Sequence, residues 1–332
     1  MELAPYPWQR HQWQRLMQQQ EGDRLAHAYL LMGECGLGKR HFALSAAARL
    51  LCTSPADNKA CGNCRSCQLL GSGSNPDLLL VEPEDSKVIK IDQVRQLAEF
   101  SSKTSHSNSR KVVILQQAEV LNVNAANALL KTLEEPPAST VLLLVSDNPG
   151  RLLPTIRSRC QRILFAVPNQ QQALEWLAAN APGETGLEGL LLLAANRPVQ
   201  ALELLHSDEL QDRDNVLTGL AAVLVGKLDP VDFSATGKTI GAEKIMDWLW
   251  QTSSLTVKHL LLHEPPEAAG QALRLIYQAL AGSARSEDEI LARLLGINQA
   301  AEEARQQLIG ASNPNPQLVL EGILWRWSRL VS

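Results

Sequence analysis

The chain has 332 residues, 45% of them hydrophobic and 20% charged, and its formal net charge at pH 7 is −4. This length suits two or three domains, and the composition argues against intrinsic disorder. The slightly acidic balance excludes attraction of the whole molecule to DNA. Contact with nucleic acid would therefore need a local patch or partner subunits.

No run of apolar residues reaches membrane-spanning length, and residues 1–5 lack the basic start and apolar core of a signal peptide. We therefore expect a cytoplasmic protein with no membrane contact. In that compartment the six cysteines are expected to bind metal or to be buried rather than to form disulfides.

The first predicted helix follows Pro7, and Trp13, Leu16 and Met17 recur in it at helical spacing. We interpret this helix as packed on the surface of the first domain. The alternative is an aromatic platform for nucleobases, which requires exposed rings.

A glycine-rich segment, residues 33–40, follows an apolar run at 28–32 and precedes a helix-like run at 41–51. We call residues 33–40 the glycine loop. Strand, loop and helix in this order form the context in which a P-loop binds phosphates. Backbone N–H groups at the glycines would surround the phosphates, and Lys39 would reach the outer ones. The glycines of this pattern are Gly33, Gly36 and Gly38.

The last position of the P-loop pattern is normally Ser or Thr, whose hydroxyl holds Mg²⁺. Here that position is Arg40, a permanent cation without an oxygen. Because Mg²⁺ needs oxygen ligands and is repelled by a guanidinium, the sequence predicts a nucleotide-binding frame with one catalytic part replaced.

Four cysteines follow the glycine-loop helix: Cys52, Cys61, Cys64 and Cys67. Two residues between successive members of the last three let one tight turn direct several sulfurs at one point. Four thiolates form a closed, structural zinc site, because no position is left for water. An iron–sulfur cluster and a set of free buried thiols are the alternatives. Cys35 and Cys160, which stand apart from this group, are expected to pack rather than to react.

A buried strand at 111–115 is followed by Gln116 and Gln117. In P-loop NTPases an acid at this point holds Mg²⁺, and the next acid often polarises water. An amide cannot act as a base and holds Mg²⁺ poorly. Glu119 is expected to lie in the next turn or helix, away from the site. The strand therefore predicts a second, independent loss of metal chemistry.

Further apolar runs predict strands near residues 78, 141 and 163. The strand near 141 ends at Asp147 and its neighbours, which would face a γ-phosphate in an active ATPase or would simply form a turn. Helix-like segments lie between the strands, and we expect Asp92 to cap one of them. The alternation predicts an α/β fold: an open, parallel, five-stranded sheet with helices on both faces.

Val167 and the residues after it read as a linker, and the chain beyond them shows helical periodicity only. We expect three domains. Residues 1–167 would form a P-loop-like domain that carries the cysteine module at 52–67. Residues 168–207 would form a small helical lid, and residues 208–332 an all-helical domain.

The sequence resembles the delta-prime family of bacterial DNA polymerase III clamp-loader subunits, which belong to the AAA+ proteins. The segments that carry the resemblance are residues 6–8, 27–31, the four-cysteine insert, 127–137, 158–160 and 313–321. The likeness covers nearly the whole chain. It implies an AAA+ P-loop domain, a lid and a C-terminal collar domain that holds subunits together.

The resemblance also supplies roles. The arginine of the Ser158-Arg159-Cys160 motif would reach the ATP of a neighbouring subunit and act there as an arginine finger. The chain would bind nucleotide weakly or not at all and would not hydrolyse it. Val199 stands where active relatives carry a lid arginine. The implied partners are the gamma/tau ATPase subunits and the delta subunit, with the sliding clamp met indirectly and primer–template DNA met through the assembled complex.

Other hypotheses remain open from the residues alone. Arg159 would form an ordinary ion pair with a neighbouring carboxylate if it had no catalytic part. The chain would be an autonomous P-loop ATPase if Glu119 or Asp147 replaced the missing acids. It would be a zinc-dependent nucleic-acid-binding module if the cysteine insert contacted DNA, although few basic residues surround Cys61 and Cys67.

Overall fold

The computed structural model describes residues 3–84, 87–105, 110–137, 139–263, 271–309 and 314–331. The chain forms two compact units, Met1–Trp176 with Asn196–Gln200, and Leu177–Ala195 with Ala201–Ser332. The domain boundaries expected at residues 167 and 207 stay predictions. Among the described residues, no helix has both the length and the apolar character needed to span a membrane.

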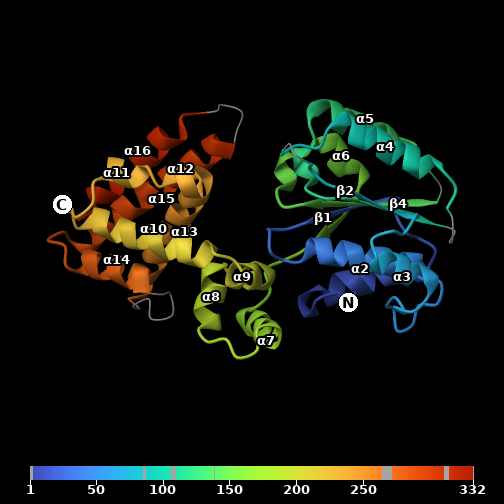
Figure 1. Ribbon diagram of the computed structural model, residues 1–332, viewed down its shortest axis with the longest axis horizontal. Helices are drawn as coiled ribbons and strands as arrows, with labels where there is room; N and C mark the ends of the chain where they lie inside the picture. Colours follow the sequence, from blue (N-terminus) through green and yellow to red (C-terminus); the bar gives the residue numbers. More distant parts are fainter. Residues whose placement is uncertain are drawn as a thin grey trace. The chain divides into compact units, whose positions relative to one another are not determined.

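The first unit contains a sheet of five parallel strands, in the order β2-β3-β4-β1-β5 (Figure 1). The strands are β1 (Ala28–Met32), β2 (Leu78–Val81), β3 (Lys111–Leu115), β4 (Thr140–Ser146) and β5 (Gln161–Leu164). All described residues of β1, β3 and β4 are buried or nearly so, as expected for strands covered on both faces. The predicted sheet is confirmed.

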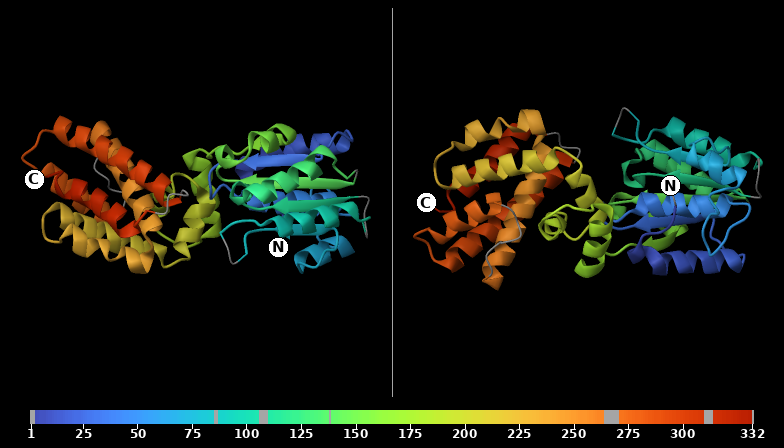
Figure 2. Two further views of the ribbon diagram at one scale, coloured as in Figure 1. Left: turned by 90° about the horizontal axis from the view of Figure 1, so that it is seen from above. Right: turned by 60° about the horizontal axis from the view of Figure 1, so that its bottom comes forward.

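Helices cover both faces of this sheet (Figures 1 and 2). On one face Tyr29 and Leu31 pack with α1 (Arg10–Glu21) and α2 (Lys39–Leu51). On the other face, residues of alternate parity in the strands pack with α4 (Ile91–Ser102), α5 (Val123–Glu134) and α6 (Pro154–Arg159). The period of two along each strand thus builds two hydrophobic cores. The first helix is packed as predicted, with Trp13, Leu16 and Met17 buried.

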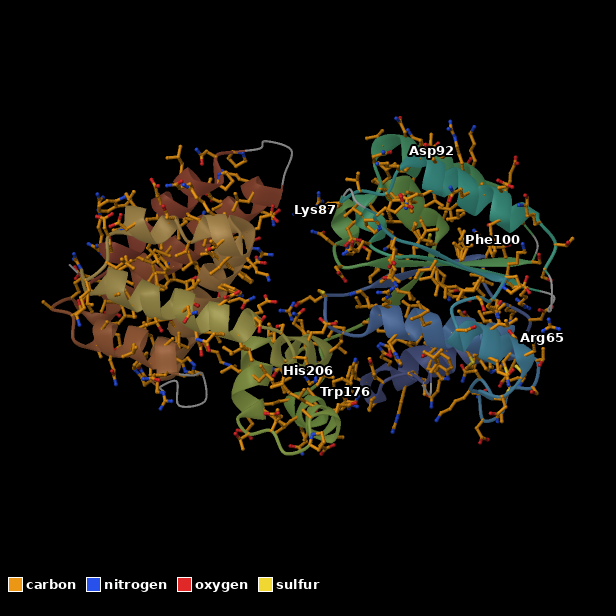
Figure 3. All side chains as sticks on the ribbon, in the orientation of Figure 1. Arg65, Lys87, Asp92, Phe100, Trp176 and His206 are labelled. Carbon is orange, nitrogen blue, oxygen red and sulfur yellow. The ribbon has the colours of Figure 1, made fainter. Side chains whose placement is uncertain are left out.

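The expected N-cap of α4 was wrong by two residues. The helix begins at Ile91, and Lys90 occupies the N-cap. The side-chain oxygen of Gln93, the third residue of the helix, accepts a hydrogen bond from the backbone N–H of Lys90 at 3.0 Å. This backbone donor at the start of the helix therefore has a partner. Asp92 lies in the first turn, exposed and 2.9 Å from Arg95 (Figure 3). A carboxylate in the first turn is stabilised by the helix dipole, so an acidic residue indicates the start of the helix without being its N-cap.

The described residues beyond β5 form helices only. They are α7 (Gln170–Asn180), α8 (Leu187–Leu193), α9 (Pro198–Leu205), α10 (Glu209–Leu224), α11 (Pro230–Ser234), α12 (Gly237–Ile240), α13 (Ala242–Leu262), α14 (Gln271–Ala281), α15 (Glu287–Ile309) and α16 (Pro316–Ser328). One apolar cluster runs through α10 to α16. This part of the chain is therefore all-helical, as the periodicity predicts.

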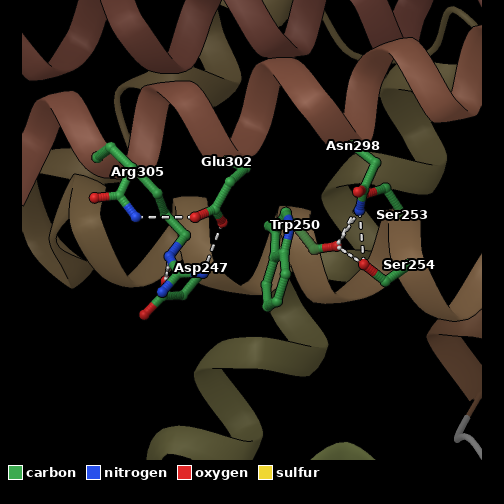
Figure 4. A network of polar contacts seen from close by, with 8 residues as sticks. Asp247, Trp250, Ser253, Ser254, Asn298, Glu302 and Arg305 are labelled. Atoms are coloured by element: carbon green, nitrogen blue, oxygen red, sulfur yellow. Dashed lines mark hydrogen bonds and ion pairs between the residues drawn. The ribbon is translucent and has the colours of Figure 1, made fainter. Parts of the chain in front are cut away.

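Polar contacts join α13 to α15 beside that cluster (Figure 4). Arg305 lies 2.6 Å from Asp247 and 3.0 Å from Glu302, and its guanidinium stands 4.7 Å from the ring centre of Trp250. The side-chain amide of Asn298 donates to two hydroxyls on the facing helix, those of Ser253 and Ser254, at 2.8 and 2.6 Å. These contacts fix the register of two helices that otherwise meet through apolar side chains.

Candidate nucleotide site, arginine end and metal centre

The glycine loop connects β1 to α2, as a P-loop would. Gly36 and Gly38 have φ angles of +78° and +77°, a region that disfavours other residues. Both also meet close neighbours, because an added Cβ would collide with Gln200 at Gly36 and with the Tyr6 ring at Gly38. The glycines therefore serve contacts with the chain's own side chains.

Lys39, the phosphate-binding residue of the pattern, is bound by oxygens of its own chain. Its Nζ lies 2.6 Å from Asp147 Oδ1 and donates to the carbonyls of Gly33 at 2.7 Å and Glu34 at 2.5 Å. The side chain is only 3% exposed. An ammonium group has three N–H donors, so all of them have partners. Asp147 thus stands where a phosphate oxygen would be needed.

The N-terminal segment covers the end of the glycine loop. The indole N–H of Trp8 donates to the carbonyl of Leu37 at 3.0 Å. The buried side-chain amide of Gln9 donates to the same carbonyl at 2.9 Å and to that of Gly38 at 3.1 Å. These bonds occupy backbone carbonyls of the loop and hold the segment across it.

Aromatic rings extend this cover. The Tyr6 ring stacks on His41, the third residue of α2, at 4.3 Å between ring centres, and Trp176 meets Tyr6 edge-on at 5.0 Å. His41 Nε2 lies 2.6 Å from the carbonyl of Ala4. Burial lowers the pKa of His41, and the Ala4 hydrogen bond only partly offsets this, so the ring stays neutral. The chain brings Tyr6 and Trp8 against the loop, a contact that the sequence analysis did not predict.

The residues that replace the Mg²⁺ ligands differ in their contacts. Arg40 pairs with Glu82, which follows β2, at 3.1 Å, and both side chains are about half exposed. Among the described residues, the Nε2 atom of Gln116 is buried without a hydrogen-bond partner. Glu119 is nearer than expected, because its Oε1 accepts a hydrogen bond from the backbone N–H of Asp147 at 3.0 Å. That carboxylate therefore supports the partner of Lys39.

The segment that includes Val199 also contacts the glycine loop. The backbone N–H of Val199 donates to the carbonyl of Gly36 at 3.2 Å. Arg197 lies 3.8 Å from the carboxylate of Glu34. The sequence analysis missed Arg197, although it lies only two residues before the position assigned to the lid arginine. Its nearest acid belongs to the loop itself, so it too faces an internal anion.

Arg159 and Ser158 lie at the end of α6, beside the N-terminal ends of the strands, whereas the glycine loop follows the C-terminal end of β1. The register pairs Met32, which precedes the glycine loop, with Leu164 at the end of β5. Since α6 precedes β5 and the loop follows β1, the two sites lie at opposite ends of parallel strands. Ser158 donates its hydroxyl hydrogen to the carbonyl of Thr155 at 3.1 Å. The structure therefore does not bring Arg159 to the glycine loop of its own chain.

Arg159 contacts a carboxylate and a helix carbonyl. Its Nη2 lies 2.7 Å from Glu134 Oε1, and its Nη1 donates to the carbonyl of Thr155 at 3.1 Å. The side chain of Arg159 is 36% exposed and that of Glu134 49% exposed. Cys160, next in the chain, is buried, and burial raises its pKa to about 12. Cys160 packs as predicted, whereas the same expectation for Cys35 was wrong, because Cys35 is exposed.

Four sulfurs come together as predicted for a metal centre. The Sγ atoms of Cys52, Cys61, Cys64 and Cys67 all lie within 4.8 Å of one another. The Cys52 and Cys64 sulfurs are 3.9 Å apart, close to the edge of about 3.8 Å in a tetrahedron with 2.3 Å zinc–sulfur bonds. Cys52 follows the last turn of α2, and Cys64 caps α3 (Arg65–Gly71; Arg65 is labelled in Figure 3). The donor set fits a four-thiolate metal ion.

Backbone N–H groups point at two of the four sulfurs, and the pKa shifts of the four cysteines go in both directions. The backbone N–H groups of Cys61 and Cys64 point at the sulfurs of Cys52 and Cys61, each at 3.3 Å. At Cys64, burial is outweighed by hydrogen bonds with Thr53 and Cys67, which lower the pKa to about 5. Burial raises the pKa of Cys67 to about 12. A bound cation would favour the thiolate form of all four cysteines.

Comparisons with known proteins identify the family to which the chain belongs. A family model described as DNA polymerase III, delta subunit matches residues 8–169. The DNA polymerase III subunit delta' of Pseudomonas aeruginosa is 38% identical over 330 residues, which are 98% of both chains. The chain belongs to the DNA polymerase III subunit delta' family. The delta' subunit of Haemophilus influenzae is 33% identical over 96% of this chain and 95% of its own length.

The likeness to solved structures is more distant than the likeness to the delta' family. A Thermotoga maritima protein described as related to a DNA polymerase III gamma subunit aligns with 96% of this chain and 99% of its own. Its sequence identity is 18%, and the TM-score is 0.41.

Proposed function

We propose that this chain is a clamp-loader subunit of DNA polymerase III that does not hydrolyse ATP and that supplies Arg159 to a neighbouring ATPase subunit. Its partners would be the gamma/tau ATPase subunits and the delta subunit. Through the assembled complex it would support loading of the sliding clamp onto primed DNA during replication. Membership of the delta' family supports this setting.

The observation that carries the proposal is the state of Lys39. A P-loop lysine must present its N–H groups to phosphate, but here Asp147 and two loop carbonyls accept them. A phosphate would have to displace a carboxylate that is already in contact, and it would approach a loop whose carbonyl oxygens repel it. Nucleotide binding is therefore weak or absent.

The missing oxygen ligands add to this. Arg40, Gln116 and Gln117 replace residues that hold Mg²⁺ or activate water in P-loop ATPases. The two carboxylates that could replace the missing acids are also committed, since Asp147 pairs with the lysine and Glu119 accepts a hydrogen bond from the Asp147 backbone N–H. An autonomous ATPase is for that reason the weaker hypothesis.

Arg159 supports the second half of the proposal. It lies at the edge of the sheet opposite to the glycine loop of its own chain, and more than a third of its side chain is exposed. A guanidinium at the surface can reach a phosphate on another subunit, where it stabilises the charge that develops in phosphoryl transfer. Ser158 would orient the turn that carries it.

The experiment uses an assembled complex in which only the neighbour that faces Arg159 has an active P-loop. Arg159→Ala should lower ATP turnover at this site about 10³-fold, the smaller effect measured for arginine fingers. The control is Arg162→Ala, which removes a nearby exposed arginine and should leave turnover unchanged. The isolated wild-type chain should neither hydrolyse ATP nor bind a fluorescent ATP analogue. Normal turnover with Arg159→Ala would remove the proposed role, and hydrolysis by the isolated chain would establish the autonomous ATPase.

For the cysteine group we propose a structural zinc ion. Elemental analysis of protein purified without added metal should find about one zinc per chain, because four thiolates fill the tetrahedral shell of one ion. Cys64→Ser should lose the metal, whereas Cys35→Ser, a cysteine outside the group, should retain it. Iron with visible absorbance would instead indicate an iron–sulfur cluster.

A further inference from the structure

Glu134 occupies an unfavourable place for a carboxylate. It is the last residue of α5, where the helix dipole presents partial negative charge, and Glu135 follows it. The cation that contacts this carboxylate is Arg159, whose Nη2 lies 2.7 Å from Glu134 Oε1. The pair therefore joins the functional arginine to a carboxylate that needs a cation.

The same contact leaves Arg159 accessible. The guanidinium also donates to the carbonyl of Thr155 on its own helix, which sets its direction. Both partners of the ion pair are at least one-third exposed, so water and a larger anion can approach them. Ion pairs at this exposure favour the bound state by only about two- to five-fold.

From this geometry, and on the basis of the function proposed for Arg159, we propose that Glu134 is a positioning residue. It holds the guanidinium of Arg159 at the surface of the chain and gives it up to the phosphate of the neighbouring nucleotide. A terminal phosphate carries more negative charge than a carboxylate and offers several oxygens to the planar guanidinium, so it competes successfully.

Glu134 has another cation within reach after this exchange. Lys131 lies one turn earlier on α5 and is exposed. Residues three apart on a helix are neighbours, so the ammonium group can partly compensate the carboxylate when Arg159 leaves. Because Arg159 must leave Glu134 before it binds the phosphate, the competition between carboxylate and phosphate would appear in the apparent affinity of the neighbour for ATP.

The test is Glu134→Gln in the single-site complex described above, with ATP turnover measured against ATP concentration. Removing the competitor should lower the KM for ATP about two- to five-fold and leave kcat unchanged. Glu134→Asp retains the charge and should return the KM toward the wild-type value. Glu135→Gln is the matched control, because it removes the next carboxylate and leaves the Arg159 pair intact.

A double variant separates this role from a structural one. In the Arg159→Ala background, Glu134→Gln should have no further effect on KM, since no guanidinium remains to be released. An unchanged KM in Glu134→Gln, together with a large loss in Arg159→Ala, would overturn the positioning role and leave the proposed function standing. A lowered kcat in Glu134→Gln would also overturn it. Full activity of both single variants would overturn the proposed function itself.

Discussion

Lys39 and Arg159, the two cations around which function has been argued, are held in opposite ways at opposite edges of one sheet. Lys39 is 3% exposed and contacts three oxygens of its own chain, one of them from Asp147. Arg159 is 36% exposed and pairs with Glu134, which is itself half exposed. A buried cation that is bound by several oxygens of its own chain contributes to the fold. A cation at the surface with an exchangeable partner remains available to another molecule.

The comparison has a simple energetic basis. Removing one member of a buried ion pair leaves the other charge uncompensated, at a cost of about 3–5 kcal/mol, whereas surface pairs contribute about 0–1 kcal/mol. Variants at the two sites should therefore differ in stability and in activity in opposite senses.

The largest effect is expected for Lys39→Met. Because Asp147 remains 35% exposed and can regain water, we expect the free energy of unfolding to fall by about 3 kcal/mol, the lower end for a buried pair. Urea denaturation of the purified chain measures this. Lys103→Met is the control, since Lys103 pairs at the surface with Glu99 at 2.7 Å. Equal stability of the two variants would mean that the Lys39 ion pair contributes no more to the fold than a surface ion pair.

Asp147→Asn should have the next largest effect. The asparagine oxygen and the two loop carbonyls can still accept hydrogen bonds from the buried Lys39 ammonium. We therefore expect a loss of about 2 kcal/mol, as for a hydrogen bond to a charged group, rather than the cost of a fully uncompensated buried charge. The substitution also frees a place for an external anion. Inorganic phosphate should raise the melting temperature of Asp147→Asn and leave that of the wild type unchanged. A shift of the wild-type chain with phosphate would mean that Asp147 does not exclude anions.

A smaller, pH-dependent effect is expected at His41, in the cover over the glycine loop. Burial lowers its pKa in the folded chain below the ordinary value of about 6.5, so the unfolded chain takes up the proton first as pH falls. Stability contributed by the neutral ring is present above about pH 6.5 and is lost as pH falls through the folded pKa. Melting temperatures between pH 7.5 and 5 should decline less for His41→Gln than for the wild type.

The smallest effect on stability is expected for Arg159→Ala. Loss of an exposed ion pair should change the free energy of unfolding by no more than about 1 kcal/mol, measured as for Lys39→Met. The same variant should have the largest effect on ATP turnover in the complex. If Arg159→Ala lowered the free energy of unfolding by about 3 kcal/mol or more, Arg159 would be a structural residue like Lys39.

The sequence predicted the sheet well because its strands carry strong local signals. Val112, Val113 and Ile114 form a continuous apolar run that only a strand buried on both faces explains, and the glycine loop identifies β1 and α2 at once. Cys61, Cys64 and Cys67 were predicted from their spacing, since two residues between ligands suffice to bring sulfurs together, and Cys52 from its place at the end of the preceding helix.

The partners of the functional residues were harder to predict, because they come from distant parts of the chain. No residue near Lys39 in the sequence predicts its contact with Asp147, which follows β4 more than a hundred residues later. Tyr6 likewise meets Gly38 from more than thirty residues earlier in the chain. Glu134 was within the motif that carries the resemblance, but only the geometry pairs it with Arg159.

The contact between Lys39 and Asp147 has a consequence for how the subunit would respond to its surroundings. A free ligand acts in proportion to its concentration, but a carboxylate fixed in the same chain has a constant local concentration beside the lysine. Swings in the cellular ratio of ATP to ADP would leave this balance untouched. In the complex proposed above, this domain would therefore offer its neighbours the same surface at every nucleotide concentration.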